Sequence, residues 1–208
     1  MKSLSTYILE HIKKLSNQTG IIVFDIDDTL LKADSSEISI YKKTPNGEIA
    51  LSTDEFAKDP DAGNSEMFDF RDFNDPIKIY QSIISGTPLI KNLKIMDAYI
   101  NAGYEFCFLT ARACEDVVKS ALNSFLKTKK PNGVLTELGD AFNKTLSHAV
   151  NDKLAKYPGK TDAEKKANIL IKLCKEYDKV VFVDDDKKNI SAAKQLDLKN
   201  LTVIKAWQ

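Results

Sequence analysis

Three aspartates and a threonine follow directly on a short apolar segment near the beginning of the chain. The apolar segment is residues 21–24, and the polar residues after it are Asp25, Asp27, Asp28 and Thr29. A short segment rich in β-branched residues is typical of a buried strand. Because side chains alternate along a strand, Asp25 and Asp27 lie on the same side of the backbone, where their charges repel each other. A hard divalent cation removes this repulsion, so the segment predicts a magnesium site that keeps positions for water and a substrate phosphate.

A second apolar segment ends in the same way much later in the chain. Residues 180–183 lead into Asp184, Asp185 and Asp186, and Asn189 follows. The carboxyl ends of parallel strands meet along one edge of an open α/β sheet, and ligands bind at that edge. We therefore expect the two acidic strand ends to meet at one metal ion.

These segments resemble the motifs of a known family. Residues 25–29, Asp-Ile-Asp-Asp-Thr, match the Asp-x-Asp-x-Thr signature of the haloacid dehalogenase (HAD) superfamily of phosphotransferases. Asp184 and Asp185, with Asn189, resemble the fourth motif of that superfamily. The resemblance covers residues 20–207, nearly the whole chain, and the order of the motifs makes the set specific.

The resemblance implies a role for each of these aspartates. Asp25 would be the nucleophile that attacks phosphorus and forms an aspartyl-phosphate, which splits one difficult displacement into two easier ones. Asp27 would protonate the leaving oxygen and then deprotonate the water that hydrolyses the intermediate, and its backbone carbonyl would reach the metal ion. Asp185 would be the direct third metal ligand, with Asp184 assisting it or binding through water.

The second motif would supply groups that bind the phosphate. Thr110 ends the apolar residues 106–109, and its hydroxyl would donate to a phosphate oxygen, assisted by the backbone N–H of Ala111. Arg112 has two readings: it could reach the phosphate or the rest of the substrate, or it could pair with acidic residues at the surface.

The third motif requires a lysine, and three lysines precede the second acidic strand: Lys160, Lys165 and Lys166. At helical spacing Lys166 shares a face with Leu170 and Leu173, which turns it towards the sheet, whereas Lys165 lies on the solvent side. A lysine on the inner face needs a negative partner, because burying it alone is costly. Phosphate and the aspartates would supply that partner. We therefore predict Lys166 as the phosphate-binding lysine, with Lys160, in the loop before the helix, as the alternative.

The rest of the chain alternates between helical and extended patterns. Strands that alternate with helices indicate an α/β fold with a doubly wound, Rossmann-like parallel sheet, which is also the fold that the resemblance implies. Helices are predicted at residues 4–17, 88–100, 115–126, 161–177 and 189–196, and further strands at 106–109 and 201–204.

Two segments interrupt this alternation within a single predicted HAD-like domain, residues 1–208. In residues 32–87, the sequence Pro45-Asn46-Gly47 between alternating segments predicts a hairpin at residues 38–52. In the HAD superfamily a flap covers the active site at this place, and residues 53–87 either extend it as a small cap or form a surface excursion packed on its own aromatic residues.

The second insertion, residues 128–160, is rich in lysine, and we expect a helix at about residues 137–150. Residues 119–166 contain ten lysines and five acidic residues, whereas residues 53–87 contain eight acidic and three basic residues. Both patterns are typical of solvated surface, although the lysines could also form a basic rim that attracts an anionic substrate.

Composition limits the class of protein. The chain has 208 residues and a formal net charge of zero, so no overall charge drives binding to nucleic acid or to a membrane. Its three cysteines show no zinc-site or disulfide spacing, and no apolar segment is long enough to span a bilayer. We therefore expect a cytoplasmic protein without a membrane partner.

The function predicted from the resemblance is a Mg²⁺-dependent phosphatase that hydrolyses phosphomonoesters through an aspartyl-phosphate. Its substrate would be a phosphorylated small molecule or nucleotide, or a nucleic-acid 3′-phosphate, with a sugar phosphate as the alternative. A catalytically silent HAD-like binding protein is the competing class, and loss of Asp25, Asp27 or the late aspartates would be its sequence mark. None of these residues is missing. The sequence leaves the oligomeric state open.

Overall fold

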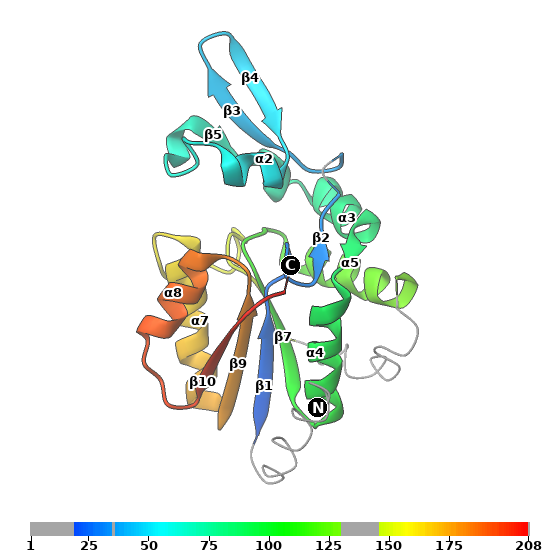
Figure 1. Ribbon diagram of the computed structural model, residues 1–208, viewed down its shortest axis with the longest axis vertical. Coiled ribbons are helices and arrows are strands. Elements are labelled where there is room, and N and C mark those ends of the chain that lie inside the picture. Colours follow the sequence, from blue (N-terminus) through cyan, green and yellow to red (C-terminus); the bar gives the residue numbers. More distant parts are fainter. Residues whose placement is uncertain (1–18, 35, 130–145, 208) are drawn as a thin grey trace.

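The computed structural model describes residues 19–34, 36–129 and 146–207, and its centre is a parallel β-sheet of five strands in the order β10-β9-β1-β7-β8 (Figure 1). The strands are β1 (Gly20–Phe24), β7 (Glu105–Thr110), β8 (Leu146–Ala149), β9 (Lys179–Asp184) and β10 (Leu201–Lys205). The predicted strands at residues 21–24, 106–109, 180–183 and 201–204 are therefore confirmed.

The register of the three central strands brings their carboxyl ends to the same level. Phe24 of β1 pairs with Phe108 of β7 on one side and with Val183 of β9 on the other. The backbone N–H of Asp25 continues this pairing and donates to Val183 O at 3.0 Å. Residues that follow these strands therefore meet at one edge of the sheet, as the sequence predicts.

Helices cover both faces of the sheet. Successive side chains of a strand point to opposite faces, and those of β1 are apolar on both, so each face has to be covered. Ile22 and Phe24 pack towards α3 (Pro76–Ser85), α4 (Ile90–Asn101) and α5 (Glu115–Thr128). Ile21 and Val23 pack towards α7 (Asp162–Glu176) and α8 (Lys187–Gln195) on the opposite face. This α/β sheet with helices on both faces is compatible with a Rossmann-like fold (Figure 1).

Two helices begin two residues away from the predicted position, and the predicted helix ends differ by one or two residues. The helix expected from residue 88 begins at Ile90, because β6 (Thr87–Pro88) pairs antiparallel with β2 (Leu31–Lys32). The helix expected from residue 189 begins at Lys187, because the Asp186 carboxylate accepts hydrogen bonds from the N–H groups of Lys188 and Asn189. The helix expected from residue 161 begins as predicted, with a capping box formed by Thr161 and Glu164.

Residues 38–74 form a separate layer, the inserted subdomain, which lies beyond the carboxyl edge of the sheet (Figure 1). The predicted hairpin is present as β3 (Ile40–Thr44) and β4 (Gly47–Leu51), and β5 (Phe68–Asp69) joins β3 to complete a three-stranded antiparallel sheet. The subdomain also contains α2 (Thr53–Lys58) and the short helices η1 (Ser65–Met67) and η2 (Arg71–Asn74). Aromatic rings stack edge to face inside it, at Phe56, Phe68, Phe70 and Phe73.

The basic insertion is described only in part, since residues 130–145 lie outside the described residues, as does the predicted helix at 4–17. Within the part that is described, the expected helix up to residue 150 is wrong. Residues 146–149 form β8, an edge strand that pairs parallel with β7. In the described residues, no helix has both the length and the apolar character needed to cross a membrane.

Candidate active site

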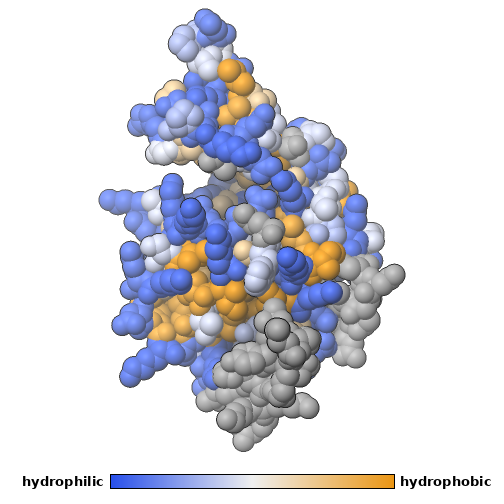
Figure 2. Space-filling view, in the orientation of Figure 1, coloured by the Kyte–Doolittle hydropathy of each residue, from blue (hydrophilic) through white to orange (hydrophobic). Residues whose placement is uncertain are grey.

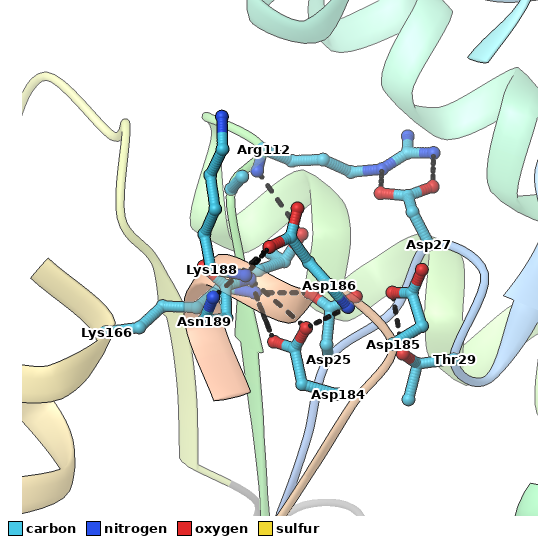
Figure 3. Close-up of polar contacts among 12 residues, drawn as sticks. Asp25, Asp27, Thr29, Arg112, Lys166, Asp184, Asp185, Asp186, Lys188 and Asn189 are labelled. Atoms are coloured by element: carbon cyan, nitrogen blue, oxygen red, sulfur yellow. Dashed lines mark hydrogen bonds and ion pairs between the residues drawn. The ribbon is translucent and has the colours of Figure 1, made fainter. Parts of the chain in front are cut away.

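Three carboxylates meet at the carboxyl edge of the sheet. Asp25 follows β1, Asp184 is the last residue of the neighbouring β9, and Asp185 comes next. One carboxylate oxygen from each lies within 4.8 Å of the other two. Figure 3 shows the three carboxylates and their polar contacts. Asp25 and Asp184 are buried, and Asp185 is half-buried. The two acidic strand ends predicted from the sequence are therefore brought together.

Lys166 lies between two of these carboxylates. Its Nζ donates to Asp25 Oδ1 at 2.7 Å and to Asp184 Oδ2 at 2.9 Å, and only 2% of the side chain is exposed. Helix α7 positions Lys166, because Leu170 and Leu173 on the same helix face pack in the core against Ile21 and Val23 of β1. The inner-face placement expected from helical spacing is thus observed.

The other two lysines lie away from this cluster. Lys165 Nζ donates to Asn151 Oδ1 at 2.6 Å and lies 3.6 Å from an Asp162 oxygen. Lys160 is exposed, and its backbone N–H donates to Glu164. Of the three candidates for the third motif, Lys166 is therefore the one in contact with the aspartates.

The Asp184 carboxylate is held by donors from two elements. Asn189 Nδ2 of α8 lies 3.1 Å from both of its oxygens. The backbone N–H of Asp186 donates to Oδ1 at 2.9 Å, while Lys166 occupies Oδ2. Each Asp184 oxygen thus has two hydrogen-bond donors, which fixes the orientation of the carboxylate.

The turn after β1 carries the remaining residues of the first motif. Asp28 adopts a left-handed conformation with φ 53°, which aspartate tolerates better than most residues, and its N–H donates to Leu31 O. Thr29 is buried, and its hydroxyl donates to Asp185 Oδ1 at 3.3 Å. Thr29 therefore connects the first acidic strand end to the second.

A buried asparagine, which sequence reasoning missed, secures this turn. Asn92 Nδ2 of α4 donates to Thr29 O at 2.7 Å and to Trp207 O at 2.9 Å, and Asn92 Oδ1 accepts from the N–H of Trp207 at 2.9 Å. The sequence could have indicated this role. Asn92 lies three residues after Leu89 and next to Leu93, so it is a polar residue on the apolar face of the predicted helix.

Among the described residues, the acidic partner of Arg112 is Asp27 and not a carboxylate at the surface. The side chain is fully buried, Nε donates to Asp27 Oδ2 at 2.8 Å, and Nη2 donates to Asp27 Oδ1 at 2.7 Å (Figure 3). Nη1 donates to Ser82 Oγ at 2.7 Å and to Ile79 O at 3.3 Å, both in α3. The Asp27 carboxylate is consequently paired with an arginine and lies outside the group of three metal-ligand candidates.

Thr110 and Ala111 lie where β7 ends. The Thr110 hydroxyl is buried and accepts a hydrogen bond from the backbone N–H of Arg112 at 3.2 Å. Ala111 O accepts from Asn151 Nδ2 at 2.6 Å, and the N–H of Val150 donates to Thr110 O at 2.9 Å. The loop after β8 therefore fixes the second motif.

The crowded charges shift the pKa values of the cluster. Burial, with smaller contributions from Asp184 and Asp27, raises the pKa of Asp25 well above its usual value, although Lys166 acts in the opposite direction. Burial and the neighbouring charges of Asp184 and Asp28 raise the pKa of Asp185 to about 6. Burial alone would lower the pKa of Lys166, but Asp25 and Asp184 outweigh it and raise that pKa, so Lys166 stays protonated.

The donor set fits a hard divalent cation. When all three carboxylates are ionised, they and the ammonium of Lys166 together carry two negative charges. Oxygen ligands around such an excess of negative charge are what Mg²⁺ and Ca²⁺ prefer.

Comparison of the chain with protein-family models gives no match, and comparison with curated proteins gives none either. The function is therefore inferred from the residues of this site.

Proposed function

We propose that the protein is a Mg²⁺-dependent phosphomonoester hydrolase of the HAD type that acts through an aspartyl-phosphate on Asp25. The observation that carries the proposal is the cluster of Asp25, Asp184, Asp185 and Lys166 at the carboxyl edge of a parallel sheet. It combines a nucleophilic carboxylate, a cation site and a fixed ammonium within hydrogen-bond distance.

Asp25 and Asp185 would hold the cation together with the backbone carbonyl of Asp27. Both oxygens of Asp184 already accept two hydrogen bonds, which favours Asp185 as the direct ligand and Asp184 as the residue that orients Lys166. When bound, Mg²⁺ would neutralise charge on the phosphate and align phosphorus with the Asp25 carboxylate.

The reaction proceeds in two displacements. An Asp25 oxygen attacks phosphorus, the bond between phosphorus and the ester oxygen breaks, and the leaving oxygen takes a proton from Asp27. Water then attacks phosphorus, gives its proton to Asp27, and the bond between phosphorus and Asp25 breaks. Lys166, the Thr110 hydroxyl and the N–H of Ala111 stabilise negative charge on the phosphoryl oxygens in both steps.

The inserted subdomain would serve as the flap and cap over this site. Figure 2 shows a notch between the subdomain, at the top of the view, and the sheet domain below it. The backbone N–H of Ala113 donates to Phe73 O at 3.2 Å, which places η2 of the subdomain against the second motif. A phosphate ester bound at Asp25 would have its leaving group close to this element.

Hydrolysis of p-nitrophenyl phosphate with Mg²⁺ and with EDTA tests the proposal. We expect Mg²⁺-dependent turnover, no turnover in EDTA, loss of turnover in Asp25→Asn, and competitive inhibition by fluoroberyllate, which mimics the aspartyl-phosphate. Asp186→Asn is the matched control, because Asp186 is an exposed carboxylate of the same loop and asparagine caps a helix equally well. Turnover that persists in Asp25→Asn would refute the covalent route, and absence of turnover in the wild type would favour a catalytically silent binding protein.

A panel of nucleotides, sugar phosphates and 3′-phosphorylated oligonucleotides would then identify the substrate class. If the lysines of residues 119–166 recruit a nucleic-acid end, activity on the oligonucleotide should fall steeply with salt, because each phosphate contact releases counterions. Equal salt responses for oligonucleotide and small substrate would leave a small-molecule phosphatase.

A further inference from the structure

Arg112 contacts two parts of the molecule that are distant from it in the sequence, the turn after β1 and the segment formed by η2 and α3. Its guanidinium binds both oxygens of Asp27 in the turn after β1 and, through Nη1, Ser82 Oγ and Ile79 O in α3. The guanidinium carbon also lies 5.9 Å from the centre of the Phe73 ring in η2. Helix α3 follows the inserted subdomain in the chain and packs against α5 of the sheet domain.

The geometry of this contact is specific to arginine. Two parallel N–H donors on two carboxylate oxygens form a fork that a lysine ammonium cannot reproduce. The orientation of the guanidinium is set from the other side, because Ser82 Oγ is buried and in turn donates to Ile79 O at 3.0 Å. Asp27 still exposes 24% of its side chain, so the pair leaves the carboxylate open on one side.

We propose that Arg112 is a positioning residue that holds the Asp27 carboxylate at the place where it exchanges a proton with the substrate oxygens. The inference rests on the proposed function, because Asp27 has this role only in phosphoryl transfer. Arg112 binds the carboxylate of Asp27 and not its backbone carbonyl, which would reach the cation, so it acts through the proton-carrying group of Asp27. Helix α3 supplies the fixed point, so the place of Asp27 depends on the helix that leads out of the inserted subdomain.

A misplacement of about 1 Å in a catalytic group lowers a rate by about 10²-fold. We therefore expect Arg112→Lys, which keeps the charge but loses the fork, to lower kcat on p-nitrophenyl phosphate at least tenfold with little change in KM. Ser82→Ala, which leaves the Asp27 pair intact and removes only the anchor, should lower kcat by a smaller factor. Arg71→Lys is the matched control, because Arg71 is the other arginine of the chain and pairs with Glu48 at the exposed surface.

A double-mutant cycle separates positioning from general support of the fold. If Arg112 acts through Asp27, Arg112→Lys should change the rate less than threefold in an Asp27→Asn background. A tenfold loss in both backgrounds would overturn the inference, because it would mean that Arg112 acts independently of Asp27. An unchanged kcat in the Arg112→Lys single variant would overturn it as well.

The dependence of the rate on the leaving group provides a second readout. Across a series of substituted phenyl phosphates, Arg112→Lys should lower kcat/KM, which reports the first displacement, more for poor leaving groups than for good ones, because poor ones depend more on a proton from Asp27. The loss of kcat on p-nitrophenyl phosphate reports instead the second displacement, in which Asp27 deprotonates water. An equal loss of kcat/KM for every leaving group would overturn the inference. These outcomes concern Arg112 alone, whereas a wild-type protein without Mg²⁺-dependent turnover would refute the proposed function and the inference with it.

Discussion

At the scale of single residues, the candidate site brings several carboxylates together, and their repulsion lowers the stability of the folded protein. Asp25, Asp184 and Asp185 lie together, and the pKa values of Asp25 and Asp185 are raised because burial and mutual repulsion disfavour their ionised forms. Sites that bind a cation are arranged in this way, since the energy of repulsion is released when the cation arrives.

Asp185→Asn should therefore stabilise the metal-free protein at pH 7.5. The pKa of Asp185 is about 6 in the folded protein, above its ordinary value of 3.8, so the folded protein loses stability as pH rises from about 4 to 6. Because Asp185 is only half-buried and water screens its charge, we expect a gain of about 1 kcal/mol, smaller than the full shift implies. Thermal unfolding in EDTA measures it.

The gain should disappear at pH 4, where the aspartate is protonated in the wild type. In the proposed function Mg²⁺ stabilises the wild type by mass action, and this effect should be lost in Asp185→Asn. A variant that is less stable than the wild type at pH 7.5 in EDTA would contradict the account of charge repulsion.

Lys166→Met should have the opposite effect on the metal-free protein. It removes the only ammonium shown in contact with Asp25 and Asp184 among the described residues, and leaving buried charges uncompensated costs about 3 kcal/mol or more. Urea denaturation in EDTA checks this loss. Lys165→Met is the matched control, because the contacts of this neighbouring lysine in the described part of the chain are with Asn151 and Asp162 near the surface. We expect it to cost less than about 1 kcal/mol.

At the scale of elements, the structure depends on polar contacts that tie helices to the turns of the site. Asn92→Ala would leave Thr29 O and both backbone groups of Trp207 without their partner inside the protein. We expect a loss of about 2–3 kcal/mol in the free energy of unfolding and a lower kcat, since unsatisfied buried groups retain their full desolvation cost. Asn101→Ala, an exposed position at the end of the same helix, should change neither quantity by a comparable amount.

The elements that end in site residues could be predicted from the sequence because they are buried on both faces. Strands of this kind read as continuous apolar segments, and the polar residue that follows each one marks its end. Strand β8 could not be predicted in this way, because it is a four-residue edge strand, Leu-Ser-His-Ala, without an apolar run, and its pairing with β7 is long-range. The pairing of Arg112 with Asp27 could not be predicted either, because it is also a long-range contact. The direction of the guanidinium is set by Ser82 and Ile79 of α3, which the sequence does not place beside Arg112.

At the scale of the whole molecule, the inserted subdomain has a core of its own. The stacked rings of Phe56, Phe68, Phe70 and Phe73 lie apart from the two clusters that hold the sheet and its helices. Strands β2 and β6 pair on either side of the segment that contains the subdomain and α3. The two ends of the subdomain itself lie close together, because the N–H of Ser39 donates to Asp72 Oδ2 at 3.0 Å.

Replacement of residues 38–74 by a flexible glycine-serine linker should therefore leave a folded sheet domain. If the subdomain is a cap, the shortened protein should still hydrolyse p-nitrophenyl phosphate but should lose most of its discrimination among phosphate esters. Circular dichroism and the substrate panel measure the two expectations. Unchanged discrimination with an intact fold would mean that the subdomain is a surface excursion without a part in substrate choice.

The distances along the chain between the site residues have a consequence for biosynthesis. Asp25 and Lys166 are 141 residues apart, and Thr29 and Asp185 are 156 residues apart. Contacts of such high sequence separation form late, after the entropy of closing long loops has been overcome. A chain emerging from the ribosome therefore carries Asp25 and Asp27 long before their partners exist. The repulsion among the aspartates should arise only when β9 docks beside β1, so the cation binding that we propose would report a late step of folding.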